Sequence, residues 1–421
     1  MPSQTLAQKL LAAASGRAAV AVGDIVTCRV DLAMFHDSSG PRRLKPMLES
    51  LGTGIWDRDK VVLVMDHYVP EADDESRKIV RIARDWAVEQ ALPHVYDSVG
   101  ICHVVVPEHG HIRPGMLCVG GDSHSPTGGA FGAYMFGVGS TEMLGVVASG
   151  EIWIQVPQTL MMQWDGALAP GVTAKDMMLH MIGRFGMNGG RYQAVEFCGE
   201  AVRALSMQER MTLSNMSAEI GSQVGLVAPD DTTAAYLAQA GVGEPIDVAR
   251  WQSDADAQAE RYRFDASTLA PHVAAPHSPA NSRPIADYEA TPMQVAYIGA
   301  CTGAKLEDLR AAASVLRGRR IAPGMSLMVA PASLRDQRQA DSEGVMAALV
   351  DAGATLLPNS CGACSGYGGS IPEGANVIAS TARNFQGRMG ARTAQVYLAS
   401  PYTVAAAAVA GHLIDPREML Q

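Results

Sequence analysis

The sequence has no excess of positive charge and no apolar run long enough to cross a membrane. Its 33 Lys and Arg residues are outnumbered by 43 Asp and Glu residues, for a formal net charge of -10. This balance argues against a non-specific surface for nucleic acid or anionic membranes, although it allows a local pocket for small anions. The apolar segment 405–410 is far too short for a bilayer, and residues 1–22 show no signal-peptide pattern. We therefore expect no nucleic-acid or membrane partner.

Cysteine is scarce and its number is odd, with seven residues in a chain of 421. A secreted disulfide framework normally uses a denser and even-numbered set of cysteines. The number of cysteines therefore predicts reduced thiols rather than disulfide bonds, in a reducing, cytoplasmic setting.

The chain is longer than one hydrophobic core normally serves, so its 421 residues predict two or three domains. Hydrophobic residues make up 48% and charged residues 18%, which is ordinary for a folded protein. Short apolar runs alternate with helical patterns, which favours α/β layers. A proline-rich stretch around residues 271–285 loses this rhythm and is typical of a linker. We place domains at 1–157, 158–270 and 286–421.

Three of the cysteines lie in loops of small residues that follow short apolar runs. Residues 295–298 lead to Cys301, and residues 355–357 lead to the pair Cys361 and Cys364 in a Cys-Gly-Ala-Cys motif. Three thiolates suit an iron–sulfur cluster that keeps one iron without a protein ligand, and small neighbours let the backbone approach a bulky cluster. From the spacing alone, a zinc half-site, a redox pair and buried small hydrophobes all stay open.

Polar side chains follow other apolar runs in the same way. They are His36, Asp66 with His67, Asp122 with Ser123 and His124, and Arg383. Open α/β sheets place their ligand sites at such strand ends, although a polar turn or a helix cap gives the same pattern without any chemistry. A carboxylate beside an imidazole, as in Asp66–His67, orients the ring and raises its pKa. This pairing suits proton delivery to a leaving hydroxyl.

Two further pairs have a functional and a simpler explanation. Guanidinium groups bind carboxylates through two parallel hydrogen bonds, so Arg383 and Arg388 fit a di- or tricarboxylate, whereas two surface arginines are the simpler alternative. Asn215 and Glu219 are four residues apart, which predicts one face of a helix and, without other context, a solvated face.

These segments resemble the motifs of the aconitase superfamily. The family has Cys-Thr-Asn at the first cysteine site and Cys-Gly-x-Cys at the second, and Arg383–Gly390 resembles its Arg-Asn-Phe-x-Gly-Arg signature. The resemblance extends from about residue 22 to the C-terminus. It implies three α/β/α domains around a central cleft, and a [4Fe–4S] cluster with one open iron on Cys301, Cys361 and Cys364.

The resemblance also implies which residues form the site. The catalytic residues would be Asp66, His67, His103, Asp122, His124 and Glu219. The substrate-binding residues would be His36, Ser123, Asn215, Arg383 and Arg388. Three positions depart from the family pattern, because Gly303, Ala382 and Tyr68 stand where Asn is usual. The lost amides bear on cluster tuning and on the choice of substrate more than on the class of reaction.

The implied activity is that of a hydro-lyase for a malate-type di- or tricarboxylate, as the large subunit of the 3-isopropylmalate dehydratase type in leucine biosynthesis. Full-length aconitases carry a fourth, swivelling domain, and the chain ends about thirty residues after Arg388. A separate small subunit is therefore expected to provide that domain. Homoaconitase and a 2-methylmalate or dimethylmalate dehydratase are the alternative activities.

Two alternatives belong to other classes of protein. One is an iron-responsive RNA-binding regulator, as some aconitase relatives are, and the acidic balance of the chain argues against it. The other is a catalytically silent partner subunit whose cysteine site is empty or holds zinc. Metal analysis of anaerobically purified protein separates both from the enzyme.

Overall fold

The computed structural model describes residues 2–367 and 371–420. The chain divides into two compact units, and each unit is built from several chain segments. Unit 1 comprises the residues up to Asp97 together with Val105–Asp165 and Gly190–Phe264. Unit 2 comprises Ser98–Val104, Gly166–Gly189 and the residues from Asp265 onward. The three-domain boundaries and the central cleft expected from the sequence stay predictions.

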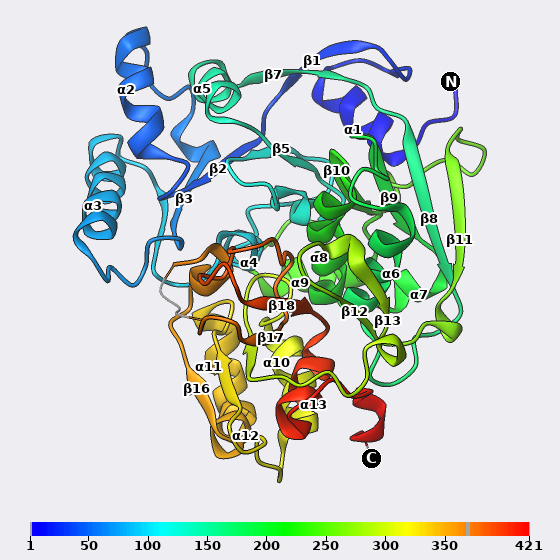
Figure 1. The fold of residues 1–421 in the computed structure, drawn as a ribbon. Coiled ribbons are helices and arrows are strands. Elements are labelled where there is room, and N and C mark those ends of the chain that lie inside the picture. The colour runs from blue at the N-terminus through cyan, green and yellow to red at the C-terminus, as the bar shows by residue number, and fades with distance from the viewer. Residues whose placement is uncertain (1, 368–370, 421) are drawn as a thin grey trace. The chain divides into compact units, whose positions relative to one another are not determined.

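Over its described residues, unit 1 contains a five-stranded sheet in the order β4-β3-β2-β5-β6 (Figure 1). Its strands are β2 (Leu32–His36), β3 (Val61–Met65), β4 (His94–Asp97), β5 (Leu117–Gly120) and β6 (Tyr134–Gly137). All neighbours in this sheet are parallel. The central strands are short apolar runs buried along their whole length, as expected where helices cover a parallel sheet. Parallel pairing brings the carboxyl ends of all these strands to one edge.

The helices of unit 1 begin at residues suited to capping. Asp73 caps α3 (Asp74–Glu89), and the apolar face of this helix buries Ile79, Ala83 and Trp86. The others are α1 (Leu6–Ala14), α2 (Pro41–Leu51), α5 (Ser140–Ser149), α7 (Glu200–Ala204), α8 (Met207–Met216) and α9 (Asp231–Gln239). Helix α4 (Cys102–Glu108) begins in unit 2 and ends in unit 1.

Two smaller sheets complete the described part of unit 1. A four-stranded sheet has the order β10-β9-β8-β11, with β8 (Thr159–Asp165), β9 (Ala194–Cys198), β10 (Val224–Val227) and β11 (Glu260–Asp265). The strands β1 (Ile25–Arg29) and β7 (Glu151–Gln155) form an antiparallel ribbon. The apolar run near residue 30 forms two separate strands, β1 and β2.

Unit 2, over its described residues, is built on a seven-stranded sheet in the order β13-β12-β18-β17-β14-β15-β16. The strands are β12 (His272–Ala274), β13 (Ser282–Pro284), β14 (Val295–Ile298), β15 (Ser326–Val329), β16 (Ala354–Leu356), β17 (Asn376–Ala379) and β18 (Gln395–Leu398). The run from β18 to β16 is parallel, and β12 and β13 add to it antiparallel. The helices are α6 (Ala174–Phe185), α10 (Leu306–Leu316), α11 (Leu334–Ser342), α12 (Val345–Ala352) and α13 (Pro401–Ala410).

The segment 271–285, predicted as a linker, is instead part of this sheet. Residues His272–Ala274 and Ser282–Pro284 pair with each other, and Ala274 pairs with Leu398 of β18. The prolines that suggested a linker lie in the turn between the two strands or at strand ends, where proline removes no ladder hydrogen bond. In the described part of the chain, no helix is both long and apolar enough to span a membrane.

Candidate functional site

In unit 1, the predicted polar residues collect at the carboxyl edge of the five-stranded sheet. His36 is the last residue of β2, and Asp66 and His67 come directly after β3. Asp122 follows β5, which pairs with β2 on its other side. Because β3, β2 and β5 are neighbouring parallel strands, their ends place these residues together, as the sequence predicted.

Two histidines and two carboxylates make close contacts at this edge. Nδ1 of His67 lies 2.6 Å from Oδ1 of Asp66. The rings of His36 and His67 stack with their centroids 3.8 Å apart and their planes inclined by 9°. The Nε2 atoms of both rings face Oδ2 of Asp122, at 3.7 Å for His36 and 3.9 Å for His67. The carboxylate of Asp66 and the imidazole of His67 thus contact each other, and Nε2 of His67 faces a second carboxylate, that of Asp122.

The carboxylates around His36 favour the protonated form of its ring. Burial lowers the pKa of this imidazole, but Asp122 and Asp37 outweigh burial and raise the pKa to about 10. A cationic ring at the end of β2 favours anionic groups beside it, which agrees with the predicted substrate-binding role.

The structure adds Asp37, which the sequence analysis did not select. Its side chain is fully buried, and its two oxygens accept the backbone N–H groups of His67 at 3.1 Å and of Tyr68 at 2.7 Å. Asp37 therefore fixes the loop that carries the Asp66–His67 pair. The only sequence signal for this role is that Asp37 follows His36 at a strand end, and its partners are thirty residues further along the chain.

A second carboxylate–imidazole pair lies in the same unit. Nε2 of His124 is 3.1 Å from Oε1 of Glu219, and both side chains are buried. The N–H of His124 is held by Oδ1 of Asp122 at 2.8 Å, which links this pair to the His36–His67 stack. The structure thus brings together two of the predicted catalytic residues, His124 and Glu219.

Asn215 and Glu219 do not share one face of a single helix, although their spacing predicted that they would. Asn215 is in α8, but the helix ends at Met216 and Glu219 lies in a 3₁₀ turn, η3 (Ser217–Ile220). Both side chains are fully buried, so neither belongs to a solvated face. Asn215 donates to Oγ1 of Thr127 at 2.8 Å, in the η2 turn (Ser125–Phe131) that follows His124. Packing of α8 against η2 is what brings these polar groups inside.

Two further predicted residues differ in their burial. Ser123 lies in the turn between Asp122 and His124, and it is exposed. His103 is buried, but it lies on the short segment Ser98–Val104 of unit 2. This segment is tied down by Ile101, whose N–H donates to the carbonyl of Ala332 at 2.8 Å. The roles of Ser123 and His103 stay predictions.

In unit 2, the three predicted cysteines follow strands of one parallel sheet. Cys301 comes three residues after β14, and Cys361 and Cys364 lie beyond β16, around the 3₁₀ turn η7 (Gly362–Ser365). Cys301 and Cys364 are buried and Cys361 is half-buried, and all three are thiols rather than disulfides. Ala300, directly before Cys301, has a φ of 69°, an uncommon left-handed conformation for a residue other than glycine. The turn that aims Cys301 is therefore held in place by its surroundings.

Two buried lysines provide such surroundings, and sequence reasoning missed both. Nζ of Lys175 lies 3.2 Å from Oγ1 of Thr302, 2.5 Å from the carbonyl of Ser380 and 2.8 Å from that of Thr381. Nζ of Lys305 donates to the carbonyl of Cys301 at 3.1 Å. Burial lowers the pKa of Lys175 to about 7.

No local signal distinguishes Lys175 from a surface lysine, because it stands in the first turn of a capped helix. Its partner Thr302 is 127 residues further along the chain. Lys175 thus joins the Cys301 loop to the segment that leads into Arg383, and only long-range folding makes that connection.

Arg383 and Arg388 follow β17 in the same sheet and are half-buried. Asn384 between them is fully buried and donates to the carbonyls of Ala275 at 2.8 Å and Val396 at 3.0 Å. This amide anchors the arginine loop to β12 and β18, so Asn384 has a structural role in the motif.

The positions that depart from the family pattern have distinct surroundings. A Cβ atom added to Gly303 would lie 2.2 Å from Oγ of Ser380 and 2.4 Å from its carbonyl oxygen, so no larger residue fits this backbone. Ala382 is buried. Tyr68 is half-buried with the guanidinium of Arg42 5.7 Å from its ring centroid, which places a cation–aromatic contact beside the His67 loop.

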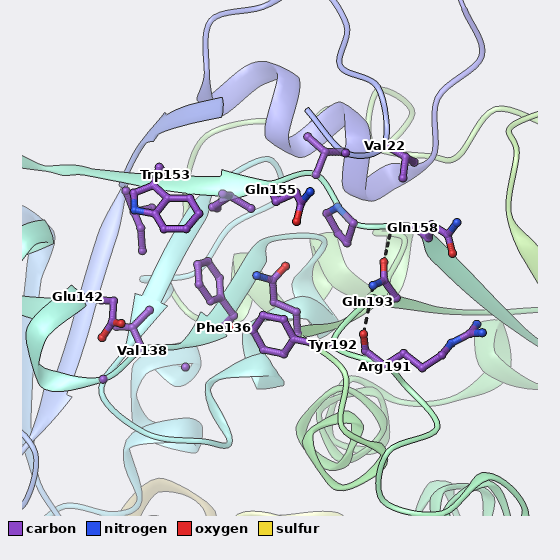
Figure 2. Close-up of a pocket in the computed structure, with 18 residues that line it drawn as sticks. Val22, Phe136, Val138, Glu142, Trp153, Gln155, Gln158, Arg191, Tyr192 and Gln193 are labelled. Carbon is purple, nitrogen blue, oxygen red and sulfur yellow. Dashed lines mark hydrogen bonds between the residues drawn. The ribbon is translucent and has the colours of Figure 1, made fainter. Parts of the chain in front are cut away.

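A separate cavity of about 860 Å³ opens in unit 1 beside the β1–β7 ribbon (Figure 2). Its wall includes Phe136, Trp153, Tyr192 and the amide side chains of Gln155 and Gln193. None of the residues predicted from the sequence lines it. It offers aromatic and amide groups but no carboxylate–imidazole pair, so proton-transfer chemistry is better supported at the sheet edge than in this cavity.

The residues at the cysteine site are chemically suited to an iron–sulfur cluster. The three thiols are the type of ligand that such a cluster takes. The small residues around them let the backbone approach a bulky inorganic group.

The fold and the site together define the class of protein. The sequence profile of the aconitase family (aconitate hydratase) matches residues 12–411. The chain therefore belongs to the aconitase family, which confirms the resemblance seen in its motifs. A crystal structure of aconitase X from Thermococcus kodakaraensis has a similar fold, with a TM-score of 0.51 and 13% identity over 85% of this chain and 84% of that one.

Curated relatives narrow the comparison within the family. The 3-isopropylmalate dehydratase large subunit 1 of Methanopyrus kandleri is 42% identical, over 99% of this chain and 100% of that protein. The 3-isopropylmalate dehydratase large subunit of Desulfatibacillum aliphaticivorans is 39% identical, over 99% of both chains. The chain is thus similar to such large subunits along nearly its whole length.

Proposed function

We propose that this chain is the large, cluster-binding subunit of a hydro-lyase of the 3-isopropylmalate dehydratase type. The observation that carries the proposal is the position of Cys301, Cys361 and Cys364 at one sheet edge, in a chain similar throughout to subunits with that name. These cysteines would hold a [4Fe–4S] cluster with one iron free of protein ligands. When bound, such a cluster supplies a Lewis acid for a hydroxyl and a carboxylate.

The residues of unit 1 would move the proton that the leaving hydroxyl needs. With Nδ1 of His67 directed at Asp66, Nε2 is the atom that can give a proton to the hydroxyl, and Asp66 stabilises the charged ring. Asp37 holds the backbone of His67 in this position. Asp122 would be held in place by His36 and by the backbone N–H of His124, whose ring is paired with Glu219. The charged groups around the substrate would then already have their positions before the substrate binds.

The arginines of unit 2 would recognise the substrate carboxylates. A dicarboxylate loses its water shell on binding, and a planar guanidinium can replace that water with two parallel hydrogen bonds. A lysine would keep the positive charge but could not make these two parallel hydrogen bonds. The pair Arg383 and Arg388 therefore fits malate-type substrates, with 3-isopropylmalate favoured and homoaconitate, 2-methylmalate or dimethylmalate types as the alternatives.

Replacing Arg388 by lysine is expected to raise KM for the substrate by roughly tenfold or more, since one good charged hydrogen bond is lost. Turnover at saturating substrate should change much less. The matched control is Arg392→Lys, because Arg392 is an exposed arginine only four residues away. Steady-state kinetics of both variants with the complete enzyme measures the difference. Equal KM values in the two variants would remove Arg388 from substrate binding.

The proposal includes a separate small subunit as partner, since the relatives are named large subunits. The purified chain, loaded with its cluster, is expected to show at most a trace of dehydratase activity on 3-isopropylmalate. Activity should appear on titration with the small subunit from the same organism and level off near a 1:1 ratio. Dehydration at enzymic rates by the chain alone would overturn this part of the proposal.

The same preparation tests the alternatives of other classes. An enzyme should contain about four iron and four sulfide per chain, whereas a silent partner subunit would contain zinc or no metal. An RNA-binding regulator would shift RNA in a gel at moderate salt. The net charge of -10 favours no such shift, and we propose that the protein works in the cytoplasm without a nucleic-acid or membrane partner.

A further inference from the structure

The hydroxyl of Tyr297 is buried beside the cysteine site with no hydrogen-bond partner among the described residues. Tyr297 is the third residue of β14, and its side chain is 0% exposed. A buried hydroxyl normally finds a partner, since an unmade hydrogen bond costs stability. If the ring served only to fill space, phenylalanine would fill it equally well without that cost.

The phenol is directed toward the turn that leads to Cys301. A Cβ atom added to Gly299 would lie 2.2 Å from Cζ and 2.3 Å from the hydroxyl oxygen of Tyr297. The absence of a side chain at Gly299 is therefore what makes room for the phenol. The hydroxyl lies at the carboxyl end of its own strand, where the chain turns toward the thiols.

The surroundings of the ring also include the second cysteine loop. Tyr297 belongs to an apolar cluster with Ala363, which stands between Cys361 and Cys364, and with Val377 of the neighbouring strand β17. Burial raises the pKa of Tyr297 well above its ordinary value, and the negative charge of the Cys364 and Cys361 thiolates raises it further. A tyrosine hydroxyl has an ordinary pKa of about 10 and is therefore protonated at neutral pH, so this phenol can donate to sulfur.

We propose that the Tyr297 hydroxyl donates a hydrogen bond to an inorganic sulfide of the iron–sulfur group held by Cys301, Cys361 and Cys364. Tyr297 is thus a positioning and tuning residue, and the inference rests on the proposed function. A donor to sulfur withdraws electron density from the cluster, which favours its reduced state and resists oxidative loss of iron.

The test compares Tyr297→Phe with the native chain, both reconstituted anaerobically. The variant should keep the full iron and sulfide content, while its midpoint potential becomes more negative and its visible absorbance is lost severalfold faster in air. In D2O, the electron–nuclear double resonance spectrum of the reduced native protein should show a strongly coupled exchangeable deuteron that is missing from the variant. The matched control is Tyr397→Phe, the same change on β18 of the same sheet, where the ring instead faces Tyr288.

Each outcome decides between the explanations. An unchanged potential, decay rate and deuteron signal in a cluster-loaded Tyr297→Phe variant would overturn the inference and leave the proposed function intact. A variant that folds normally but holds no iron also supports a contact with the cluster, because only one oxygen atom has been removed. If the native chain itself takes up no iron, the proposed function fails first, and the inference fails with it.

Discussion

Replacing Cys361 by alanine is expected to abolish retention of the intact cluster and to reduce dehydratase activity to background. Cys361 is one of only three thiols placed to hold the cluster, so its loss leaves two irons without a protein ligand. Iron and sulfide analysis after anaerobic reconstitution, together with the broad visible absorbance of the native protein, measures the effect. Circular dichroism should show that the fold persists, because Cys361 is half-buried and lies in a loop.

The control for this experiment is Cys198→Ala. Cys198 is also partly buried, but it lies at the end of β9 in unit 1 and is not one of the predicted ligands. This variant should keep both its iron and its activity. Unchanged iron content in Cys361→Ala would remove the assignment of the cluster to Cys301, Cys361 and Cys364, whatever the activity of the variant.

Replacing His67 by asparagine is expected to lower turnover by roughly a hundredfold or more while the cluster stays intact, the usual scale for the loss of a general acid. Such a loss corresponds to about 2.7 kcal/mol of transition-state stabilisation. The cause is specific, because Asp66 holds Nδ1 of the ring and leaves Nε2 to deliver the proton. KM should change less than turnover, since substrate binding is assigned to other side chains.

A matched control for the His67 variant is His94→Asn. His94 is partly buried on β4 of the same sheet, but it contacts the ring of His111 rather than the Asp66–His67 pair. This control should retain near-native turnover with the small subunit present. Near-native turnover in His67→Asn, with iron content confirmed, would remove the Asp66–His67 pair from the mechanism.

The sequence by itself determined the parts of this protein that depend on local pattern. The apolar runs Val61–Met65 and Val295–Ile298 are buried strands in the structure, as predicted. Because parallel strands share one carboxyl edge, the positions of Asp66, His67 and Cys301 near such edges also followed from their place after these runs. Motifs of small residues and thiols then indicated the family, which the comparisons confirm.

Only the tertiary structure decided which polar groups are buried and what they contact. Asn215 and Glu219 have the spacing of a solvated helical face, yet packing of α8 against η2 buries both. The stack of His36 on His67 and the reach of Lys175 to Thr302 join residues about 30 and 127 positions apart. Burial and hydrogen bonding at such separations depend on how whole elements pack, so no local pattern records them. For the same reason, only the folded chain reveals that the hydroxyl of Tyr297 has no hydrogen-bond partner among the described residues.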